Sequence, residues 1–410
     1  MNTNRTLQFA VLAALVPTSL AVAQESGGRM LEEIVVTATK RDSTIQDLPF
    51  SINAQTELDI ERMGSGTLEE LSRNVAGLAV QSLGPGQSQV AVRGVSAGQI
   101  VRDQPGVKEQ VGVYLDETVI SLSLFTPDLD LFDLKRVETL RGPQGTLFGS
   151  GSIGGTIRYI TNSPDLDSFD ANIEADLNSV ADGDIGGGLK GMVNLPLVEG
   201  RSALRLVGYT TEFAGFIDAR QEDGSFKEDV NSGNRTGARA ALTFAGDNWS
   251  VTPRIVYQEL TTDGFNRQEV FNLFAQPHTD PNDPVNPREP IQLGERQQHL
   301  LLDEEFSDET TLADIIFNAG FGSVDLTLVG SFMDRSILVS RDASALTGSV
   351  SVDVGFPEDN PSPPPAGDTV ALPSNLRDTT ELEQMTFEAR LSSNTTSAFQ
   401  WVGGVFVSDV

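Results

Sequence analysis

A period-two alternation of apolar and polar residues constrains the fold of the second half of this 410-residue chain more than any other feature. Residues 236–244, 322–332 and 385–391 each place apolar side chains at alternate positions, with polar side chains between them. Because successive side chains of a strand point to opposite faces, each segment predicts a strand with one apolar and one polar face. Arg239 and Arg390 lie in mid-strand on polar faces, which a water-filled barrel lumen permits.

Loop length distinguishes a membrane barrel from a soluble sandwich, which would show the same alternation. We expect a short loop at residues 245–249 and long loops at 261–305 and 335–381. Short turns on one side and long loops on the other are typical of outer-membrane barrels. Proline-rich stretches at 277–290 and 357–367 fit loops, because proline lacks the backbone donor that a strand ladder needs. The second half therefore predicts an antiparallel transmembrane β-barrel.

Composition excludes several classes of function. The chain contains no cysteine, so disulfides, thiol catalysis and cysteine-ligated zinc are excluded. His278, near Asp280 and Asp283, lacks the further histidine or cysteine that a transition-metal site would need, so we predict no metal site. A net charge of -30 argues against nucleic acid as a partner, because phosphate backbones require a cationic surface. No Ser/His/Asp order and no paired-carboxylate site indicates an enzyme.

The N-terminus has the pattern of a secretory leader over residues 1–23. Arg5 gives a short positive region, residues 7–16 are almost entirely apolar, and residues 21–23 match a small-x-small cleavage site. We therefore expect an exported chain whose mature form begins at Gln24. Beyond the leader no apolar run reaches 18 residues, so no transmembrane helix is expected.

Residues 44–165 differ from the second half, with short strands between glycine-containing turns. Within residues 67–80, Leu68, Leu71 and Val75 follow helical spacing, and Gly77 marks the expected helix stop. Short strands are expected at 88–95, 110–120, 134–142 and 155–162. This segment therefore predicts a compact α+β domain.

The glycines of GSGSIG, residues 149–154, match the G-x-G-x-x-G dinucleotide fingerprint. That fingerprint requires a helix after the glycines, whose N-terminus holds the pyrophosphate. The residues that follow, GTIRYIT, are rich in β-branched side chains and predict a strand. We therefore interpret these glycines as tight-turn residues and not as a nucleotide site.

Three segments of the α+β part together resemble a known family: VAVRGVSAGQ (90–99), VGVYLDETVIS (111–121) and VETLRGPQGTLFGSGSIGGTIRYITNSP (137–164). They resemble the plug domain of TonB-dependent outer-membrane receptors of Gram-negative bacteria, and EARLSSNTTSAFQWVGGVF (388–406) is also similar to the family. LEEIVVTATKR (31–41) resembles the family's TonB box. The resemblance implies a signal peptide at 1–23, a periplasmic segment with the TonB box at 24–43, a plug domain at 44–165 and the N-terminal portion of a transmembrane β-barrel in outer-membrane lipid at 166–410.

In this family the TonB box is a strand that pairs with an edge strand of TonB, a protein anchored in the inner membrane. The resemblance assigns TonB binding to Ile34, Val35, Val36, Thr37 and Ala38. We expect residues 34–39 to have no strand partner in the resting state, and the flanking charges, including Lys40 and Arg41, to keep them solvated. The alternative is that residues 34–39 form the first strand of the plug.

By the same resemblance, the structural positions of the plug are Arg93, Gly94, Arg141, Gly142, Pro143, Gly145 and Gly149. We expect Arg93 and Arg141 to pair with acidic residues of the barrel wall and so to hold the plug in place. A local salt bridge within the plug is the alternative.

Ligand contacts are expected on plug loops at 84–89, 98–106 and 121–126. Gln99, Arg102 and Phe125 are the candidates, since a buried arginine would suit an anionic ligand such as a ferric chelate. We expect no cofactor apart from such an iron chelate as ligand. The resemblance implies import of a scarce ligand, most often a ferric siderophore, powered by TonB and its inner-membrane motor proteins. Import of cobalamin or a carbohydrate is the alternative.

Receptors of this family close a barrel of about 22 strands around the plug. About 245 residues follow residue 165 (410 minus 165), and they hold about nine predicted strands. Because an open sheet would leave strand edges unpaired in lipid, we expect the sequence to be part of a longer receptor. A truncated product without function is the alternative.

Two other classes of function are disfavoured. A TonB-linked signal transducer carries a further periplasmic domain before the box, where this sequence has only residues 24–30 after the leader. A soluble exported β-rich binding protein or enzyme would need a closed core and, for catalysis, a set of catalytic side chains that the sequence does not indicate.

Overall fold

The computed structural model describes residues 35–410, except for 42, 83, 97–109, 122–126, 150, 222, 269–292, 345–372 and 396–398. Within this range Val35–Val410 forms one compact unit. The predicted leader at 1–23 and Ile34 lie outside the described residues. Among the helices that are described, none is long and apolar enough to cross a membrane.

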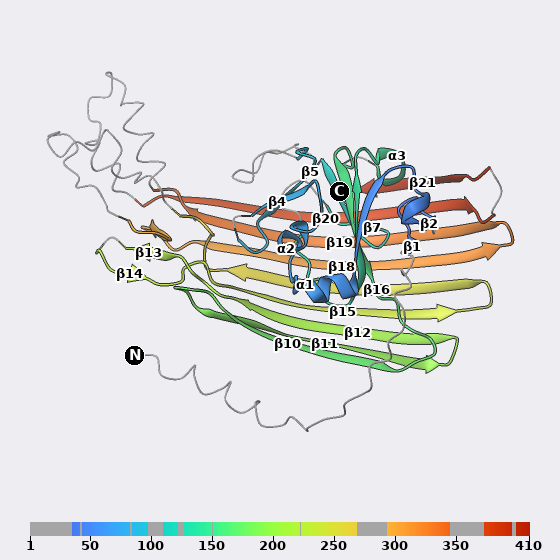
Figure 1. The fold of residues 1–410 in the computed structure, drawn as a ribbon, viewed down its shortest axis with the longest axis horizontal. Helices are drawn as coiled ribbons and strands as arrows, with labels where there is room; N and C mark the ends of the chain where they lie inside the picture. Colours follow the sequence, from blue (N-terminus) through green and yellow to red (C-terminus); the bar gives the residue numbers. More distant parts are fainter. Residues whose placement is uncertain are drawn as a thin grey trace, which may run out of the picture. The chain divides into compact units, whose positions relative to one another are not determined.

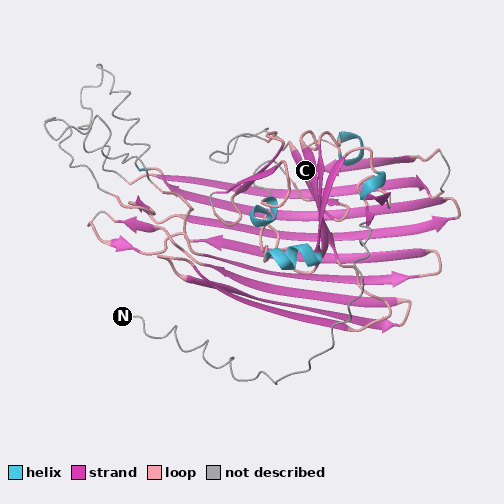
Figure 2. Ribbon diagram, in the orientation of Figure 1, coloured by secondary structure: helices cyan, strands magenta, loops and turns pink. Residues whose placement is uncertain are grey.

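A nine-stranded antiparallel sheet, called the long sheet below, runs through the second half of the chain (Figures 1 and 2). Its strands, in spatial order, are β10 (Asp170–Ser179), β11 (Ile185–Val198), β12 (Ser202–Phe213), β15 (Gly233–Ala245), β16 (Trp249–Thr262), β18 (Glu305–Phe321), β19 (Val324–Asp342), β20 (Asn375–Ser393) and β21 (Val402–Asp409). Each strand pairs with the next, which confirms the predicted antiparallel architecture.

The long sheet has one exposed apolar face and one largely buried polar face. On β15, Phe244 is 42% exposed whereas Arg239 is 8% exposed. On β20, Phe387 is 49% exposed whereas Arg390 is 8% exposed. The alternation predicted for these strands is therefore confirmed, with aromatic and aliphatic side chains on the outer face and arginines on the inner face.

One predicted loop is too wide. β19 continues to Asp342 and β20 begins at Asn375, so the outer parts of the predicted loop 335–381 are strand. Arg335 and Arg341 of β19 read as loop but are buried on the inner face, whereas Arg377 and Glu381 of β20 are exposed. Arg335, for example, is 2% exposed and lies 2.7 Å from Asp308 of β18.

A small three-stranded sheet lies in the connections of the long sheet. It consists of β14 (Phe226–Lys227), β13 (Asp218–Arg220) and β17 (Gln297–His299), in that order. β17 falls inside the segment 261–305 that was predicted to be all loop. His278, Asp280 and Asp283 of that segment lie outside the described residues.

The first half contains a mixed domain of short strands and helices (Figure 2). Its five-stranded sheet has the order β3 (Ser51–Thr56), β8 (Leu134–Arg141), β9 (Gly155–Thr161), β6 (Val111–Leu115) and β7 (Thr118–Val119). β4 (Leu78–Ser82) and β5 (Ser88–Val92) form a separate hairpin. The helices are the 3-10 helix η2 (Ile45–Asp47), α1 (Glu57–Met63), α2 (Leu68–Ser72) and α3 (Gly145–Phe148). The predicted α+β class is confirmed.

The helix predicted within residues 67–80 is shorter than expected. α2 starts with a capping box, in which Thr67 and Glu70 satisfy each other's backbone N–H groups. After Ser72 the backbone bonds tighten to the i−3 type, as in the bond from Val75 N–H to the Ser72 carbonyl, and strand β4 begins at Leu78. Leu68 and Leu71 are buried, as their helical spacing predicts.

The glycine-rich stretch at 149–154 leads directly into β9. A strand after the glycines excludes the helix N-terminus that a dinucleotide site requires. This outcome confirms the interpretation of these glycines as turn residues.

The core of the mixed domain is continuous with the inner face of the long sheet. Val113 and Ile157 are fully buried at its centre, and Val256, Leu312 and Met333 of the long sheet belong to the same apolar cluster. The mixed domain is therefore packed against the long sheet by apolar contacts as well as by the polar contacts described next.

Candidate functional site

The segment that resembles a TonB box is paired in this structure. β1 (Val35–Val36) forms a two-residue antiparallel ladder with β2 (Ser43–Thr44). The chain reverses between them through Lys40, whose N–H donates to the Thr37 carbonyl at 2.9 Å. The expectation that this strand has no partner in the resting state is therefore wrong for Val35 and Val36. Because β2 lies only a few residues away, the turn supplies a partner from the same chain.

Thr37 fixes this segment to the mixed domain. Its N–H donates to Glu138 Oε1 at 3.1 Å, and its hydroxyl oxygen accepts a hydrogen bond from Arg158 at 2.7 Å. Glu138 and Arg158 lie on neighbouring strands, β8 and β9, and both are almost completely buried. On either side of Thr37, Val36 and Ala38 are 0% exposed. The segment is thus docked by a few polar bonds and by two small apolar side chains.

Lys40 is buried, which contradicts the expectation that it keeps the segment solvated. Its ammonium lies 2.8 Å from Glu117 and 3.9 Å from Glu388, and 4.7 Å from the ring centre of Phe148. Burial lowers the pKa of Lys40 below its usual range, although the two carboxylates act in the opposite direction. The burial of Lys40 depends on contacts with residues far away in the sequence, such as Glu117, and so the local sequence does not reveal it.

Glu117 connects the docked segment to the long sheet. Besides Lys40, it pairs with Arg158 at 3.0 Å and with Arg390 of β20 at 3.1 Å. Burial alone would raise the pKa of Glu117, but Lys40, Arg158 and Arg390 outweigh it and hold that pKa well below its usual range. Arg390 also pairs with Glu388 on its own strand. One carboxylate therefore joins three parts: the docked segment (residues 35–40), the mixed domain, and the long sheet, which is called the wall below.

Basic side chains of the long sheet pair with acidic side chains of the mixed domain at several further points. In the residues that the structure describes, these pairs are Lys190 with Asp130, Arg235 with Asp128 and Asp130, Arg205 and Arg239 with Asp133, and Arg254 with Asp116. Each of the five basic side chains is less than a tenth exposed. The wall is the basic partner and the mixed domain is the acidic partner.

Apart from Asp116, these acidic partners lie in the alternating stretch DLDLFD, residues 128–133. Asp128 and Asp130 face the long sheet, where Gln258 accepts from the Asp130 N–H and donates to the Asp128 carbonyl. Leu129 and Leu131 enter the apolar core. From Asp128 to Leu131 this stretch therefore carries charge to the long sheet and apolar side chains to the core at alternate positions, and this alternation is the sequence signal for the contact.

The predicted lock by Arg93 and Arg141 is wrong. Arg141 donates to the carbonyls of Ala76 at 2.6 Å and Ile52 at 3.4 Å, so its contacts lie within the mixed domain. Arg93 is exposed, and no ion pair joins it to an acidic residue in the described ranges. The physical reason is that the charges are arranged the other way round: the long sheet supplies the arginines, and the mixed domain supplies the carboxylates.

The glycines predicted to be structural lie in turns. Gly94 follows Arg93 at the end of the β4–β5 hairpin, and Gly142 donates its N–H to the Gly154 carbonyl at 2.9 Å. Pro143, Gly145 and Gly149 belong to the turn that contains α3 and separates β8 from β9. These residues shape a connection within the mixed domain.

The candidate ligand residues Gln99, Arg102 and Phe125 lie outside the described residues. Of the three candidate ligand loops, the one at 84–89 lies within the described residues, and most of it is enclosed. Gln87 is 0% exposed, and the packing around Gly86 includes Phe306 and Leu260 of the long sheet. In this conformation the loop contacts the long sheet through Gly86, and Gly84, Pro85 and Ser88 line the cavity described next.

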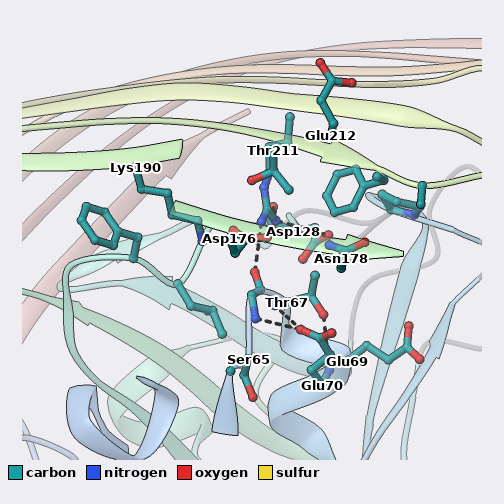
Figure 3. A pocket seen from close by; sticks show the side chains of 18 of the residues that line it. Ser65, Thr67, Glu69, Glu70, Asp128, Asp176, Asn178, Lys190, Thr211 and Glu212 are labelled. Atoms are coloured by element: carbon teal, nitrogen blue, oxygen red, sulfur yellow. Dashed lines mark hydrogen bonds and ion pairs between the residues drawn. The ribbon is translucent and has the colours of Figure 1, made fainter. Parts of the chain in front are cut away.

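A cavity of about 1030 Å³ lies between α1 and α2 on one side and strands of the long sheet on the other (Figure 3). Acidic side chains outnumber basic ones in its lining; Figure 3 shows Glu69 and Glu70 of α2 across from Asp176 and Glu212. Glu70 is engaged in the α2 capping box, and Lys190 and Arg235 are engaged with Asp130. In the part of the chain that the structure describes, no group of three or more histidine or acidic side chains is placed to hold a metal ion.

Comparison with known proteins gives a consistent result. The model of the TonB-dependent Receptor Plug Domain family matches residues 44–156. The chain is 26% identical over 262 residues to the vitamin B12 transporter BtuB of Photobacterium profundum, covering 63% of this chain and 40% of that protein. It is 28% identical over 146 residues to the ferripyoverdine receptor of Pseudomonas aeruginosa, covering 35% of this chain and 17% of that protein.

Solved structures share the fold. The pyoverdine outer membrane receptor FpvA from Pseudomonas aeruginosa, bound to pyoverdine, matches with a TM-score of 0.67 at 16% identity, over 91% of this chain and 48% of that chain. The chain thus spans less than half the length of the relatives described here. Residues 44–156 of the mixed domain thus match the plug domain of TonB-dependent receptors, and the mixed domain and the long sheet together share the fold of outer-membrane receptors of that type.

Proposed function

We propose that this protein imports a scarce ligand across the outer membrane, and that TonB supplies the work by pairing with residues 34–38. The proposal is supported by one observation above all, which is the docking of residues 35–40 onto the plug beside Glu117. Glu117 also pairs with Arg390 of the long sheet at 3.1 Å. A pull on the docked segment therefore acts directly on a contact between plug and wall.

The docked segment is weakly enough held to be exchanged for a partner. The β1–β2 ladder consists of two residue pairs, and each hydrogen bond contributes a net free energy of about 0.5–1.5 kcal/mol to stability. Local opening of such a segment is cheap compared with unfolding of the domain. A TonB strand could therefore replace β2 by β-augmentation, offering backbone hydrogen bonds in place of those lost.

The proposed ligand is a ferric siderophore, with cobalamin as the second candidate. The first is supported by the similarity to the ferripyoverdine receptor and by two fold neighbours that are named siderophore receptors. The second is supported by the similarity to the vitamin B12 transporter, which extends over 63% of this chain. Both ligands are bulky metal chelates that are present at low concentration, so the same energy-coupled design serves either one.

The coupling is tested by two proline variants in the producing strain. Val35→Pro removes a backbone donor from the strand that TonB would grip. Thr44→Pro is the matched control, because Thr44 lies opposite Val35 in the ladder and its φ of -79° suits proline. We expect V35P to abolish uptake with ligand binding retained, and T44P to keep both.

The ligand is tested with two radiolabelled probes, a panel of ⁵⁵Fe-loaded siderophores and ⁵⁷Co-cyanocobalamin. Uptake of one probe that requires this gene and is lost in V35P identifies the cargo. Equal uptake by V35P and the unaltered protein would contradict the proposed coupling. Gene-independent uptake of both probes would contradict the proposed ligand class.

A further inference from the structure

Lys40 brings its ammonium into a buried cluster of acidic and basic side chains. The four charged side chains that face it are Glu117, Glu388, Arg158 and Arg390, two acidic and two basic. Each of the two carboxylates already has an arginine partner, since Glu117 pairs with Arg158 and Arg390, and Glu388 pairs with Arg390. Removing the ammonium would therefore leave no carboxylate without a partner.

The site around Lys40 is enclosed and partly aromatic. The Lys40 side chain is 2% exposed, and its ammonium lies 4.7 Å from the ring centre of Phe148 and 5.5 Å from that of Tyr114. Taking a charge out of water is costly, and a buried ion pair often stabilises less than a well-packed apolar side chain would. Burial also lowers the pKa of Lys40, which agrees with a net disadvantage of the charged form in this site.

We propose that Lys40 is a release element for the TonB-binding segment: its buried ammonium keeps residues 35–40 only marginally docked, so that TonB can take them over. The inference rests on the proposed function, because it assigns a regulation to the same segment. It predicts the opposite of a simple salt-bridge latch. If Lys40 held the segment down, removing its charge would loosen docking, whereas here removing the charge tightens it.

The test variant is Lys40→Met in the full chain. Methionine keeps the length of the side chain, packs favourably against aromatic rings and carries no charge. Both residues would occupy the same left-handed backbone conformation, at a φ of 59°, so backbone strain is similar in the two proteins. Lys40→Gln is a second neutral variant in case methionine disturbs folding.

Arg41→Met is the matched control. It removes one positive charge from the neighbouring residue, whose guanidinium makes an exposed hydrogen bond to Gln400 at 2.8 Å. Any effect of net charge on TonB encounter is therefore shared by R41M and K40M. A difference in docking between K40M and R41M therefore measures the effect of removing the buried charge at position 40.

The first readout is hydrogen exchange of the backbone amides from Val36 to Lys40, without TonB. We expect exchange to be slower in K40M than in the unaltered protein by about tenfold or more, with less than a twofold change in R41M. The reaction of the Lys40 amine with an N-hydroxysuccinimide ester, located by mass spectrometry, gives the opening rate in the unaltered protein itself. Faster or unchanged exchange in both K40M and K40Q would overturn the inference.

The second readout is binding of the isolated C-terminal domain of TonB. Because TonB binds the released segment, its affinity should fall in K40M by the same factor as the exchange rate. If the unaltered protein does not bind TonB at all, the proposed function fails while the exchange result still decides the role of Lys40. If TonB binds K40M more tightly, the inference fails and the proposed function stands.

Discussion

Arg235, on β15 of the barrel-type sheet, lies 2.7 Å from Asp130 of the plug, and the two side chains are 1% and 0% exposed. Asp130 also accepts from Lys190 of β11 at 3.1 Å. One plug carboxylate thus joins two strands of the wall in a place closed to solvent. Contacts of this kind fix the plug to the long sheet.

Asp130→Asn is predicted to destabilise the plug strongly. The change leaves Lys190 without its closest carboxylate and weakens the partner set of Arg235, so two buried cations lose compensation. Breaking a buried pair from one side typically costs about 3–5 kcal/mol. Thermal unfolding of the plug, monitored by the protease sensitivity of residues 44–165, should show this loss of stability while the long sheet stays folded.

Asp128→Asn is the matched control for that variant. Asp128 lies 3.7 Å from Arg235, and burial raises its pKa above the ordinary value, an effect that Arg235 only partly offsets. A carboxyl whose pKa is raised on folding stabilises the folded state below its unfolded pKa and loses this contribution as pH rises through the folded pKa. D128N should therefore be neutral or slightly stabilising near pH ~7, and less favourable near pH ~4. A loss at neutral pH as large as that of D130N would contradict this assignment.

Much of the architecture follows from the sequence because it depends on local pattern. The alternation around Arg239 and Arg390 predicts strands with a polar inner face, and the burial of these two arginines agrees. The strand after the glycines at 149–154 is predicted by its β-branched residues. Loop ends are less predictable, since Arg335 and Asp342 read as loop yet lie on strand β19.

The partners within the site could not be predicted in the same way. Thr37 bonds to Glu138, which is 101 positions away, and Lys40 bonds to Glu117, which is 77 positions away. No local pattern encodes such a pairing. The resemblance drew attention to Arg93 and Arg141, whereas the wall contacts depend on mid-strand arginines and on the DLDLFD stretch, both visible in the sequence but without an assigned partner. The assignment of TonB binding to residues 34–38 stays a prediction.

Gly86→Ala is predicted to displace the tip of the β4–β5 hairpin from the wall. Gly86 has a φ of 73°, and a Cβ atom there would lie 2.6 Å from a ring carbon of Phe306. Gly94 has a similar φ of 79°, but a Cβ atom added there would meet no other atom within 4 Å. Both variants bear the left-handed cost of about 1–2 kcal/mol, so their difference reports the clash alone. Limited proteolysis within residues 78–92 should be faster in G86A than in G94A, and equal rates would contradict the packing described.

Arg141→Ala is predicted to weaken the plug internally. The Arg141 guanidinium donates to the exposed Ala76 carbonyl at 2.6 Å, where water can take its place, so losing this hydrogen bond costs about 0.5–1.5 kcal/mol. Arg93→Ala should change stability by less than about 0.5 kcal/mol, because Arg93 is exposed. Plug unfolding in guanidinium chloride compares the two. A larger loss in R93A would restore the locking role first expected for it.

Cysteine cross-linking tests the central claim, pairing of residues 34–38 with TonB, most directly. The chain has no cysteine of its own, so single cysteines at positions 34 to 38 and at Thr44 are unambiguous probes. They are combined, in iron-limited cells, with a single cysteine on the edge strand of TonB. The account predicts disulfide cross-links at alternate positions from 34 to 38, none from position 44, and loss of the cross-links at positions 34, 36, 37 or 38 when V35P is added. Absence of cross-links at all five positions, or cross-links that V35P leaves unchanged, would contradict it.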